Sequence, residues 1–533
     1  MPTRAPFDWL LVDRAERIVD WSKAGVWSGG IKGIPNYPVG ITVNTTTPTH
    51  QYYCDPTGVV DCRAKLKAAL DACPKGSAVY LPAGLYRTNA TILMPNRVAL
   101  RGAGPTLTTI KCYYDGDAVY MSGSMNEQPS NIVSGYAKGS TQIVVASGTN
   151  FATGDLVIID QLNDPSFVNI VGSEDTCTWC DRYDTGTRAL GEMNRIVSKS
   201  VNTLNLELPL LNEYSGAYVP RACPIGKYAS GGVAESAGVE DLAITHSNPS
   251  WTNTVAVHFH VAYGCWVKRC NLYGQAHKGV WLYGMCLACE VRDSYIHDFT
   301  QFDSDHGYPI GCQYQSSYNL FENNIIKMGH GACIFGSAGS AGNVVGYNYV
   351  HSTKHYQTDW FIQAFGDHGA HPFMNLFEGN IVGKFAFDFI HGSGSHEFVF
   401  RNHVTGQNPE VAVTSNLSAI EVESWHYKMS FVGNALTYPG NPNAPWLLTS
   451  QSLTLNSMLR HGNYDFATGS TAWDGTISAR GIPSSLYLNA KPAWFGSLVW
   501  PTIGPDIVGF VKPIPAKARW DKYVISGNVS ELF

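Results

Sequence analysis

A short apolar pattern with a polar centre returns through residues 239–436, and it constrains the fold more than any other feature of the chain. The copies are VEDLAI, VKRCNLY, CEVRDSYI, LFENNII, VVGYNYV, LFEGNIV and FVFRNHV, with SFVGNAL as a looser eighth. Their polar centres are Leu242, Asn271, Ser294, Asn324, Asn348, Asn380, Asn402 and Asn434. The spacings between centres are 29, 23, 30, 24, 32, 22 and 32 residues. A unit of about 22–24 residues, lengthened in alternate turns, is typical of a solenoid whose coils stack on one another.

The recurring asparagine indicates which solenoid this is. An inward-facing Asn at a turn can bond backbone groups and the Asn of the next coil, which forms a ladder. A leucine-rich horseshoe has a similar period, but it needs Leu-rich copies that alternate with helices. These copies are rich in Phe, Val, Ile and Asn, without a helical pattern between them. The sequence therefore predicts an all-β protein, a right-handed parallel β-helix.

Size and charge narrow the classes of partner. The chain has 533 residues, of which 15% are charged, and a net charge of −6. Such a length usually means several domains, but a solenoid core grows along one dimension. The mild negative charge argues against a nucleic-acid partner, because nucleic-acid-binding proteins are strongly basic. No apolar run reaches the roughly 20 residues that span a bilayer, so no membrane partner is expected; the oligomeric state stays open.

The cysteines bear on the compartment. The start, MPTRAPFDWLLVDRAERIVDW, lacks the basic-then-apolar layout of a signal peptide. Thirteen cysteines are nevertheless many for a cytosolic chain. Cys54, Cys62 and Cys73 lie close together, and Cys177 and Cys180 form a single CxxC, where zinc would want two such pairs. We expect one or two disulfides and an extracellular or periplasmic location.

The coil pattern divides the chain. Residues 1–53 read as an irregular N-terminal arm, and residues 54–436 as the β-helix. A small β insertion at about 140–210 interrupts the helix, because its strands read as hairpins rather than coils. Residues 437–533 lose the pattern, are rich in Pro and Trp, and are expected to pack on the solenoid as a C-terminal cap.

A helix is expected near the N-terminal end of the solenoid. Asp61 can cap a helix over about 62–73. Its apolar face comprises Leu66, Ala69, Leu70 and Cys73. An open solenoid end presents unpaired strand edges that invite aggregation, so we expect this helix to plug the first coil.

The stretch from 54 to 112 also carries a family resemblance. The run DCRAKLKAALDAC, followed by AVYLPAGLYRTNATILMPNRVALRGAG, resembles the N-terminal entry segment of the pectate-lyase-like superfamily of β-helix proteins. That superfamily includes polygalacturonases, rhamnogalacturonases, uronate epimerases and phage tailspikes. The resemblance implies a right-handed β-helix that acts on polysaccharide, but it does not choose the reaction, because one fold carries many chemistries.

The strand that precedes each polar centre alternates between apolar and polar residues. In VAVHFH, His258 and His260 lie opposite the apolar face. Counting back 11 and 13 residues from each centre predicts two outer columns about 4.8 Å apart per coil. The substrate-binding residues predicted from these columns are His260, Trp281, Tyr283, Gln313, Phe335 and Glu423. Such a surface suits an extended carbohydrate, because sugar rings stack on aromatics and hydroxyls bond amides. The alternative is a solvated polar face.

The densest cluster of titratable residues is FGDHGAHP, FDFIHGSGSHE and IEVESWH. Glycoside hydrolysis needs an acid for the leaving oxygen and a carboxylate that activates water. We predict Asp367 or Asp388 as the acid and Glu421 as the base, with His391 or His371 positioning substrate. His368 is expected to contact substrate. The pair His368 and His371 lacks the HExxH pattern and a helix, so no metal is predicted there.

A second constellation is QFDSDHGYP with KMGHGACIFGSAG. The latter resembles the GHGxxxGSxG segment of polygalacturonases, which implies substrate contacts at His330, Asp303 and Asp305. The paired aspartates of that family are contiguous, whereas Ser304 intervenes here, and its Asn-Thr-Asp and Arg-Ile-Lys motifs are not present. A calcium site or a turn cap at these aspartates is an alternative; otherwise no cofactor is expected.

Three functions compete. The leading hypothesis is a glycoside hydrolase that uses paired carboxylates in an open groove. A lyase acting on a uronate-containing glycan is the first alternative, with base or charge-neutralising groups among His368, His391, Lys384, Arg401 and Tyr427. The third is a non-catalytic glycan-binding or tailspike-like protein. All three expect a polysaccharide or oligosaccharide partner.

Overall fold

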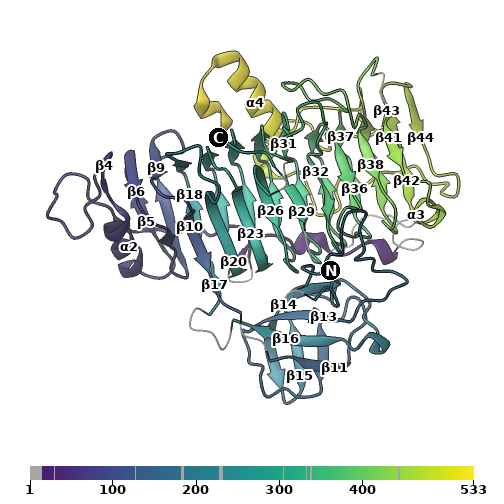
Figure 1. Cartoon of the computed structure of the whole chain (residues 1–533), viewed down its shortest axis with the longest axis horizontal. Helices are drawn as coiled ribbons and strands as arrows, with labels where there is room; N and C mark the ends of the chain where they lie inside the picture. The colour runs from purple at the N-terminus through teal and green to yellow at the C-terminus, as the bar shows by residue number, and fades with distance from the viewer. Residues whose placement is uncertain are drawn as a thin grey trace.

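The computed structural model describes residues 15–28, 31–125, 128–181, 185–226, 232–303, 305–331, 333–336, 339–441 and 444–533, and of residues 28, 31 and 333–336 the backbone alone. Three long parallel sheets run along it and wrap into a right-handed parallel β-helix (Figure 1). Successive strands in the chain belong to successive sheets, so each coil adds one strand to each sheet. The predicted fold class is confirmed.

Each sheet is a stack of strands that follow one another along the solenoid axis. The first sheet contains β7 (Ile92–Leu93), β10 (Asp117–Ser122), β20 (Val255–Tyr263), β23 (Lys278–Leu287), β26 (Tyr308–Cys312), β29 (Cys333–Gly336), β32 (Phe365–His368), β35 (Phe385–Phe387), β38 (Ile420–Val422) and β41 (Trp446–Leu448), with β17 (Ala234–Glu235) beside β20. The second contains β3 (Val39–Thr42), β5 (Ser77–Leu81), β8 (Val98–Gly102), β18 (Gly238–Glu240), β21 (Trp266–Lys268), β24 (Glu290–Arg292), β27 (Leu320–Glu322), β30 (Val344–Gly346), β33 (Leu376–Glu378), β36 (Phe398–Phe400), β39 (Ser430–Val432) and β42 (Leu459–His461). The third contains β4 (Thr57–Asp61), β6 (Gly84–Thr88), β9 (Thr108–Cys112), β19 (Ala243–His246), β22 (Asn271–Tyr273), β25 (Tyr295–His297), β28 (Ile325–Lys327), β31 (Tyr349–Val350), β34 (Ile381–Val382), β37 (His403–Val404), β40 (Ala435–Leu436), β43 (Asn463–Asp465) and the antiparallel β44 (Ser470–Ala472).

The predicted ladder of asparagines lies inside the solenoid. Each buried amide oxygen accepts the backbone N–H and the amide of the residue one coil earlier. For Asn380 these distances, from the backbone nitrogen and Nδ2 of Asn348, are 2.8 and 3.0 Å. The ladder runs through Asn324, Asn348, Asn380, Asn402, Asn434 and Asn463. Asn271 does not belong to it: Asn271 pairs with Tyr295, and Cys270 takes the ladder position with its N–H bonded to Ser294.

A second ladder was not predicted. Asn319, Asn343 and Asn375 repeat the same amide-to-amide bonds at the turn between the first and second sheets. Its last member is Glu397, whose Oε1 accepts the Asn375 amide at 2.9 Å. Two ladders therefore fix the stacking of the coils at two corners.

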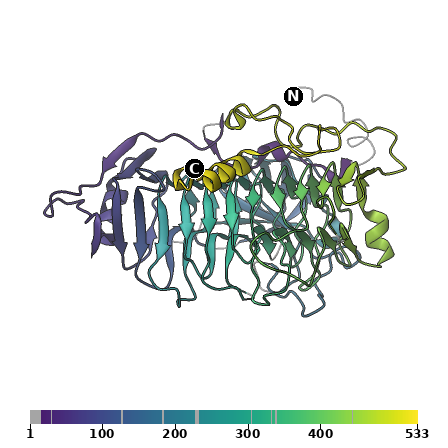
Figure 2. The same ribbon diagram turned by 90° about the horizontal axis from the view of Figure 1, so that it is seen from above.

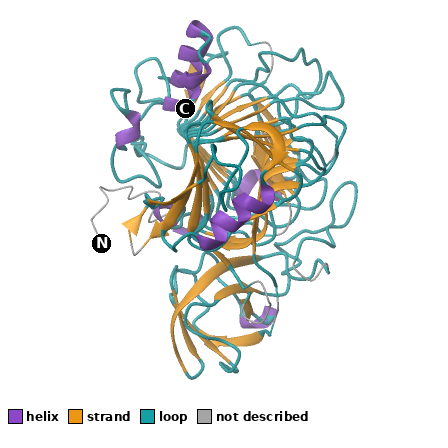
Figure 3. Ribbon diagram, turned by 90° about the vertical axis from the view of Figure 1, so that its left-hand side faces the viewer, coloured by secondary structure: helices purple, strands orange, loops and turns teal. Residues whose placement is uncertain are grey.

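The N-terminal end is closed by α2 (Arg63–Ala72), which lies across the solenoid opening in Figure 3. Leu66, Ala69 and Leu70 are fully buried in the main core. Asp61 accepts the N–H of Arg63 at 3.0 Å. The helix thus covers the apolar interior that the first coil would expose.

The insertion is a closed antiparallel barrel below the solenoid in Figure 1. Its strands are β11 (Ser130–Ser134), β12 (Gln142–Val145), β13 (Leu156–Asp160), β14 (Gly191–Ser200), β15 (Thr203–Leu206) and β16 (Arg221–Ile225). The barrel strands extend from Ser130 to Ile225, a longer segment than the expected 140–210. It interrupts the chain without interrupting the coils, because β10 before it pairs directly with β20 after it.

The coils also continue past the expected end at 436, since β41, β42 and β43 add a further turn. A short helix, α3 (Ser452–Ser457), lies between β41 and β42, and the tail after β44 contains α4 (Pro515–Ser526). The tail runs along the outside of the solenoid (Figure 2). It is anchored by Arg401, whose guanidinium binds both oxygens of Asp506 at 2.8 Å. Tyr487 donates to Glu322 at 2.7 Å.

The remaining short elements lie in the arm, the barrel and the tail. They are the antiparallel pair β1 (Trp27–Ser28) and β2 (Ile31–Lys32) and the 3-10 turns η1 (Ala15–Arg17), η2 (Trp21–Lys23), η3 (Gly216–Tyr218), η4 (Ala493–Phe495) and η5 (Val529–Leu532). None of the helices in the described ranges is long and apolar enough to cross a bilayer.

The expected disulfides are not formed. Cys54, Cys62, Cys73, Cys177 and Cys180 are buried free thiols. Their burial in apolar clusters explains the sequence pattern without a cross-link.

Candidate functional site

The outer face of the first sheet carries an aromatic stack. The rings of Tyr120, His258 and Trp281 lie one above the next on neighbouring strands, with centroids 4.5 and 4.6 Å apart. Asp117 binds Nδ1 of His258 at 2.9 Å and fixes the middle ring. Trp281 donates Nε1–H to Gln313 at 2.8 Å. We call Tyr120, His258 and Trp281 the aromatic stack.

Two predicted binding residues adjoin this stack. Tyr283 lies 4.8 Å from the Trp281 ring and 5.3 Å from the His260 ring. Burial lowers the pKa of His260 to about 4, so the ring is neutral at pH 7. The structure therefore brings His260, Trp281, Tyr283 and Gln313 together on one face. Phe335 is on β29, whose side chains lie outside the described part of the chain.

The prediction for Asp367 is wrong. Its strand neighbours are Phe335 and Phe387, and Phe387 belongs to the core, so Asp367 occupies an inward position. Asp367 is 0% exposed, and neither carboxylate oxygen has a hydrogen-bond partner among the described residues. Burial, with the charge of Asp388 added, raises its pKa well above the usual range. Asp367 therefore faces the interior, where substrate cannot reach it.

His371 is likewise buried. It is 0% exposed, with Nε2 2.9 Å from the Ser395 hydroxyl. Burial lowers its pKa to about 3. The positioning role predicted for His371 is therefore corrected to an interior hydrogen bond.

Asp388 follows β35 and turns to the outer face, where it meets His368. Nδ1 of His368 lies 2.9 and 3.1 Å from the two oxygens of Asp388. Burial raises the pKa of Asp388, but the charge and hydrogen bond of His368 outweigh it, so the pKa is lowered overall. Burial lowers the pKa of His368, and Asp388 reverses this, so its pKa is raised. The pair favours an ionised carboxylate beside an imidazolium.

The next coil supplies two more carboxylates. Phe387 and Val422 are paired, so Asp388 and Glu423 follow equivalent strand positions one coil apart, about 4.8 Å in rise. Glu423 accepts the N–H of Phe389 at 2.6 Å, and its half-buried position, with Asp388 and Glu421 nearby, raises its pKa. Glu421 faces outward and binds Nζ of Lys384 at 2.7 Å.

The barrel adds residues that the coil pattern did not predict. His391 binds Oδ1 of Asp175 through Nδ1 at 2.7 Å. The His391 ring lies 4.6 Å from the His368 ring and 5.5 Å from Trp179. Main-chain bonds hold the barrel loop there, from Ser173 to Phe389 at 2.8 Å and from Glu174 to Ile390 at 3.2 Å. No coil spacing could have indicated these residues, because they lie inside the insertion.

These groups form one electrostatic unit, since Glu174 and Asp175 also act on His368. We call Glu174, Asp175, His368, Asp388, His391, Glu421 and Glu423 the carboxylate–histidine cluster. It contains paired carboxylates with opposite pKa shifts, which is the arrangement that acid–base catalysis uses.

The second predicted constellation is a set of turn contacts. His330 is buried, stacked on Tyr308 at 4.8 Å, with its pKa lowered to about 4 by burial and His355. Asp303 accepts from His306, and Asp305 contacts Lys278. Ser304 between them lies outside the described residues. Within the described ranges no three His, Cys, Asp or Glu residues are placed to hold a metal ion. Because Ser304 is outside those ranges, the calcium site at Asp303 and Asp305 stays a prediction.

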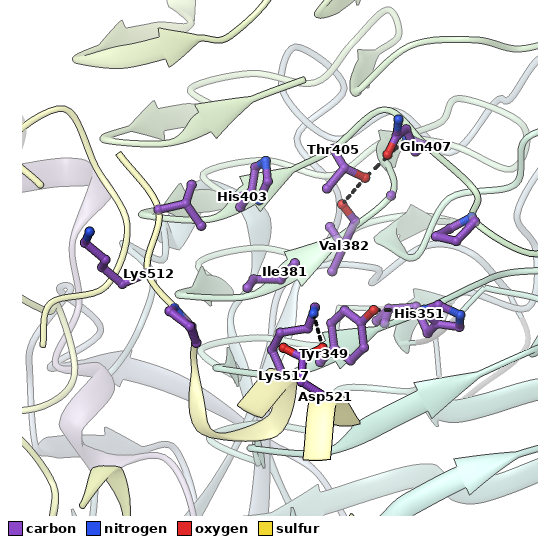
Figure 4. Close-up of a pocket in the computed structure, with 15 residues that line it drawn as sticks. Tyr349, His351, Ile381, Val382, His403, Thr405, Gln407, Lys512, Lys517 and Asp521 are labelled. Atoms are coloured by element: carbon purple, nitrogen blue, oxygen red, sulfur yellow. Dashed lines mark hydrogen bonds and ion pairs between the residues drawn. The ribbon is translucent and has the colours of Figure 1, made fainter. Parts of the chain in front are cut away.

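A cavity of about 400 Å³ lies on a different face, between the third sheet and α4. Tyr349, Ile381 and His403 line it from the sheet, and Lys517 and Asp521 from the helix (Figure 4). It contains none of the predicted catalytic residues, and the carboxylate–histidine cluster remains the candidate site.

Comparisons with known proteins agree with this fold. Residues 49–176 match the model of the family described as rhamnogalacturonase A/epimerase, pectate lyase-like. The match confirms the resemblance seen in residues 54–112. None of the curated proteins compared with the chain matches it in sequence.

Several solved structures resemble the chain. The tailspike protein gp49 of Pseudomonas phage LKA1 is 17% identical, with a TM-score of 0.47 over 73% of this chain. The tailspike gp61 of Pseudomonas phage phi297 is 14% identical, with a TM-score of 0.50 over 80% of this chain and 70% of its own. The chain spans 63% of the length of the LKA1 tailspike. At such identities the likeness shows the fold alone.

Proposed function

We propose that this chain is a glycoside hydrolase that cleaves a polysaccharide on the outer face of the first sheet, with Glu423 as the acid and Asp388 as the base. The observation that carries the proposal is the pair of carboxylates on adjacent coils whose pKa values move apart, that of Glu423 upward and that of Asp388 downward. The family described as rhamnogalacturonase A/epimerase, which matches residues 49–176, supports a glycan as substrate. With a polysaccharide as substrate, the proposal includes an extracellular or periplasmic location.

The chemistry follows from the protonation states. Glu423 donates its proton to the glycosidic oxygen as the bond to the anomeric carbon breaks. A water molecule adds to that carbon and gives a proton to Asp388. Glu423 ends as a carboxylate and Asp388 as an acid, and exchange with solvent restores both. His368 acts as a positioning residue that orients Asp388 and keeps it ionised.

The lyase alternative has less support. A lyase that acts on a uronate needs a cation to neutralise the substrate carboxylate. Arg401, one of the expected cations, is buried and bound to Asp506 under the C-terminal tail. Lys384 is bound to Glu421. The aromatic stack on the same outer face agrees equally with hydrolysis and with simple glycan binding.

The test compares product chemistry across a panel of plant, algal and bacterial polysaccharides. Hydrolysis releases reducing ends without ultraviolet absorbance, whereas β-elimination releases unsaturated ends that absorb. Glu423→Gln and Asp388→Asn should each lower the release of reducing ends by at least about 100-fold. Asp71→Asn, a surface change on α2, serves as the control. Unsaturated products, or full activity in both site variants, would remove the hydrolase proposal.

A further inference from the structure

The carboxylate–histidine cluster is unusually rich in negative charge. It contains five carboxylates, on Glu174, Asp175, Asp388, Glu421 and Glu423. Three come from coil strands or their ends, and two from the barrel loop that the main-chain bonds of Ser173 and Glu174 hold against the coil. The coils and the barrel loop, which are far apart in the sequence, therefore bring their carboxyl groups together on one small area of the surface.

Among the described residues, each basic side chain of this area already contacts a carboxylate. His368 holds Asp388 at 2.9 Å, His391 holds Asp175 at 2.7 Å, and Lys384 holds Glu421 at 2.7 Å. Of the remaining two carboxyl groups, Glu174 keeps an unbalanced charge, whereas Glu423 is the protonated group of the proposed reaction. In the described part of the chain Glu174 has no ion-pair partner and is exposed, and Glu423 accepts only a main-chain N–H.

A uronate ring would bind weakly to this arrangement. Its carboxylate needs a free Lys or Arg, for which a bidentate guanidinium is the usual partner. Here it would instead approach Glu174. Like charges placed together across an interface oppose binding and serve to reject wrong partners.

A sugar without a carboxylate would bind well to the same surface. Trp179 of the barrel is half-buried against His391, with ring centroids 5.5 Å apart. Phe389 and Trp425, also half-buried, lie 6.4 Å apart beside the cluster. Aromatic faces stack on the apolar side of a neutral pyranose, and carboxylates accept its hydroxyls.

We propose that the cluster accepts a glycan whose sugars at the cleavage point are neutral and rejects polyuronates, and that Glu174 on the barrel loop sets this preference. The inference rests on the proposed function for the place of cleavage, and it goes further by naming the substrate class. It differs from what a rhamnogalacturonase-like sequence suggests, because the charge of this site comes largely from the insertion and the late coils.

The experiment uses matched polymers. Each polyuronate in a panel is assayed beside its carboxyl-reduced counterpart, which has the same linkages without the charge, together with natural neutral polysaccharides. We expect cleavage only of neutral polymers, with uronates at least tenfold slower in kcat/KM. Glu174→Lys should raise the uronate-to-neutral ratio several-fold, since it converts repulsion into attraction. Glu213→Lys, on an exposed part of the barrel, should leave the ratio unchanged.

The outcomes separate this inference from the proposed function. Preferential cleavage of a polyuronate would overturn the inference while leaving the hydrolase proposal intact. If no polymer is cleaved, the hydrolase proposal fails, and affinity electrophoresis in gels that contain the same polymers decides the inference. Retardation by neutral polymers alone supports it, whereas retardation by uronates or by none overturns it.

Discussion

Nδ1 of His368 lies within 3.1 Å of both carboxylate oxygens of Asp388, and each group shifts the pKa of the other toward its charged form. The first prediction follows from this contact. Replacing His368 with Ala leaves Asp388 largely buried without its partner, so its pKa should rise. The acidic limb of the kcat/KM profile should then move to higher pH. A profile measured for His368→Ala beside His50→Ala, a change at an exposed ring, checks this; an unmoved limb would contradict the assigned role.

A second prediction concerns the pH window of the native protein. Asp388 must be ionised, and its lowered pKa means that activity falls only below the ordinary value of about 3.9. Glu423 must be protonated, and its raised pKa means that activity is lost as pH rises through a value above about 4.3. We expect a bell-shaped profile on the acidic side of neutrality. An optimum at alkaline pH would mean that another group supplies the proton.

Asp367 provides a test through stability instead. Its pKa is raised in the folded state, so above about pH 3.9 the folded protein binds more protons than the unfolded chain, and stability falls as pH rises toward the folded pKa. The slope for one such group is at most about 1.4 kcal/mol per pH unit. Asp367→Asn should flatten this slope above about pH 3.9 in denaturant unfolding, while cleavage is retained. Loss of activity with an unchanged slope would restore the catalytic assignment.

The ladder predicts that removing a single amide side chain lowers the free energy of unfolding substantially. Asn380 bonds Val345 and Asn402 through Nδ2 and accepts two bonds from Asn348. Asn380→Ala leaves buried groups without partners, each costing about 1–3 kcal/mol. We expect the free energy of unfolding to fall by about 3–5 kcal/mol. Asn248→Ala, at an exposed turn, should cost less than about 1 kcal/mol, measured in the same urea titration.

Trp281 tests the aromatic stack. Removing its ring takes away a stacking surface worth about 0.5–1.5 kcal/mol to a bound sugar. Trp281→Ala should therefore raise KM about 2–12-fold and change kcat less, because the ring lies several coils from Asp388. Trp473→Ala, near the C-terminal end of the solenoid, is the matched control. An equal loss in both variants would indicate a general folding defect.

The repeat predicted the solenoid because its inward asparagines are required wherever coils stack, so their spacing survives changes in the loops. It did not predict which face Asp367 occupies. Thirteen residues back from Asn434 is the outward Glu421, but thirteen back from Asn380 is the inward Asp367. The turns between the two positions differ in length, and a shift of one residue turns a strand side chain to the opposite face.

The site was only partly predictable for a related reason. Asp388, His391 and Glu421 were singled out because they lie in or after coil strands. Asp388 was predicted as the acid, but its lowered pKa favours a base, and Glu421, predicted as the base, is paired with Lys384. Glu423 was predicted to bind substrate, and its raised pKa depends on neighbours that sequence spacing cannot measure. Asp175 and Trp179 reach the site through the docking of the barrel loop, a contact between segments about 200 residues apart, for which the coil pattern has no counterpart.

The two amide ladders have a consequence for how such a protein can change. Within a coil the two ladder positions are five residues apart, as in Asn319 and Asn324, whereas the segment that returns to the next coil varies from 17 residues (Asn380 to Glu397) to 27 (Asn348 to Asn375). Loops, or a whole barrel, can therefore be inserted in these returning segments without altering the spacing of the coils. Exchanging residues 388–396 for the shorter corresponding segment of another coil, such as 369–374, should keep the ladder hydrogen bonds and alter only the ligand that the protein binds.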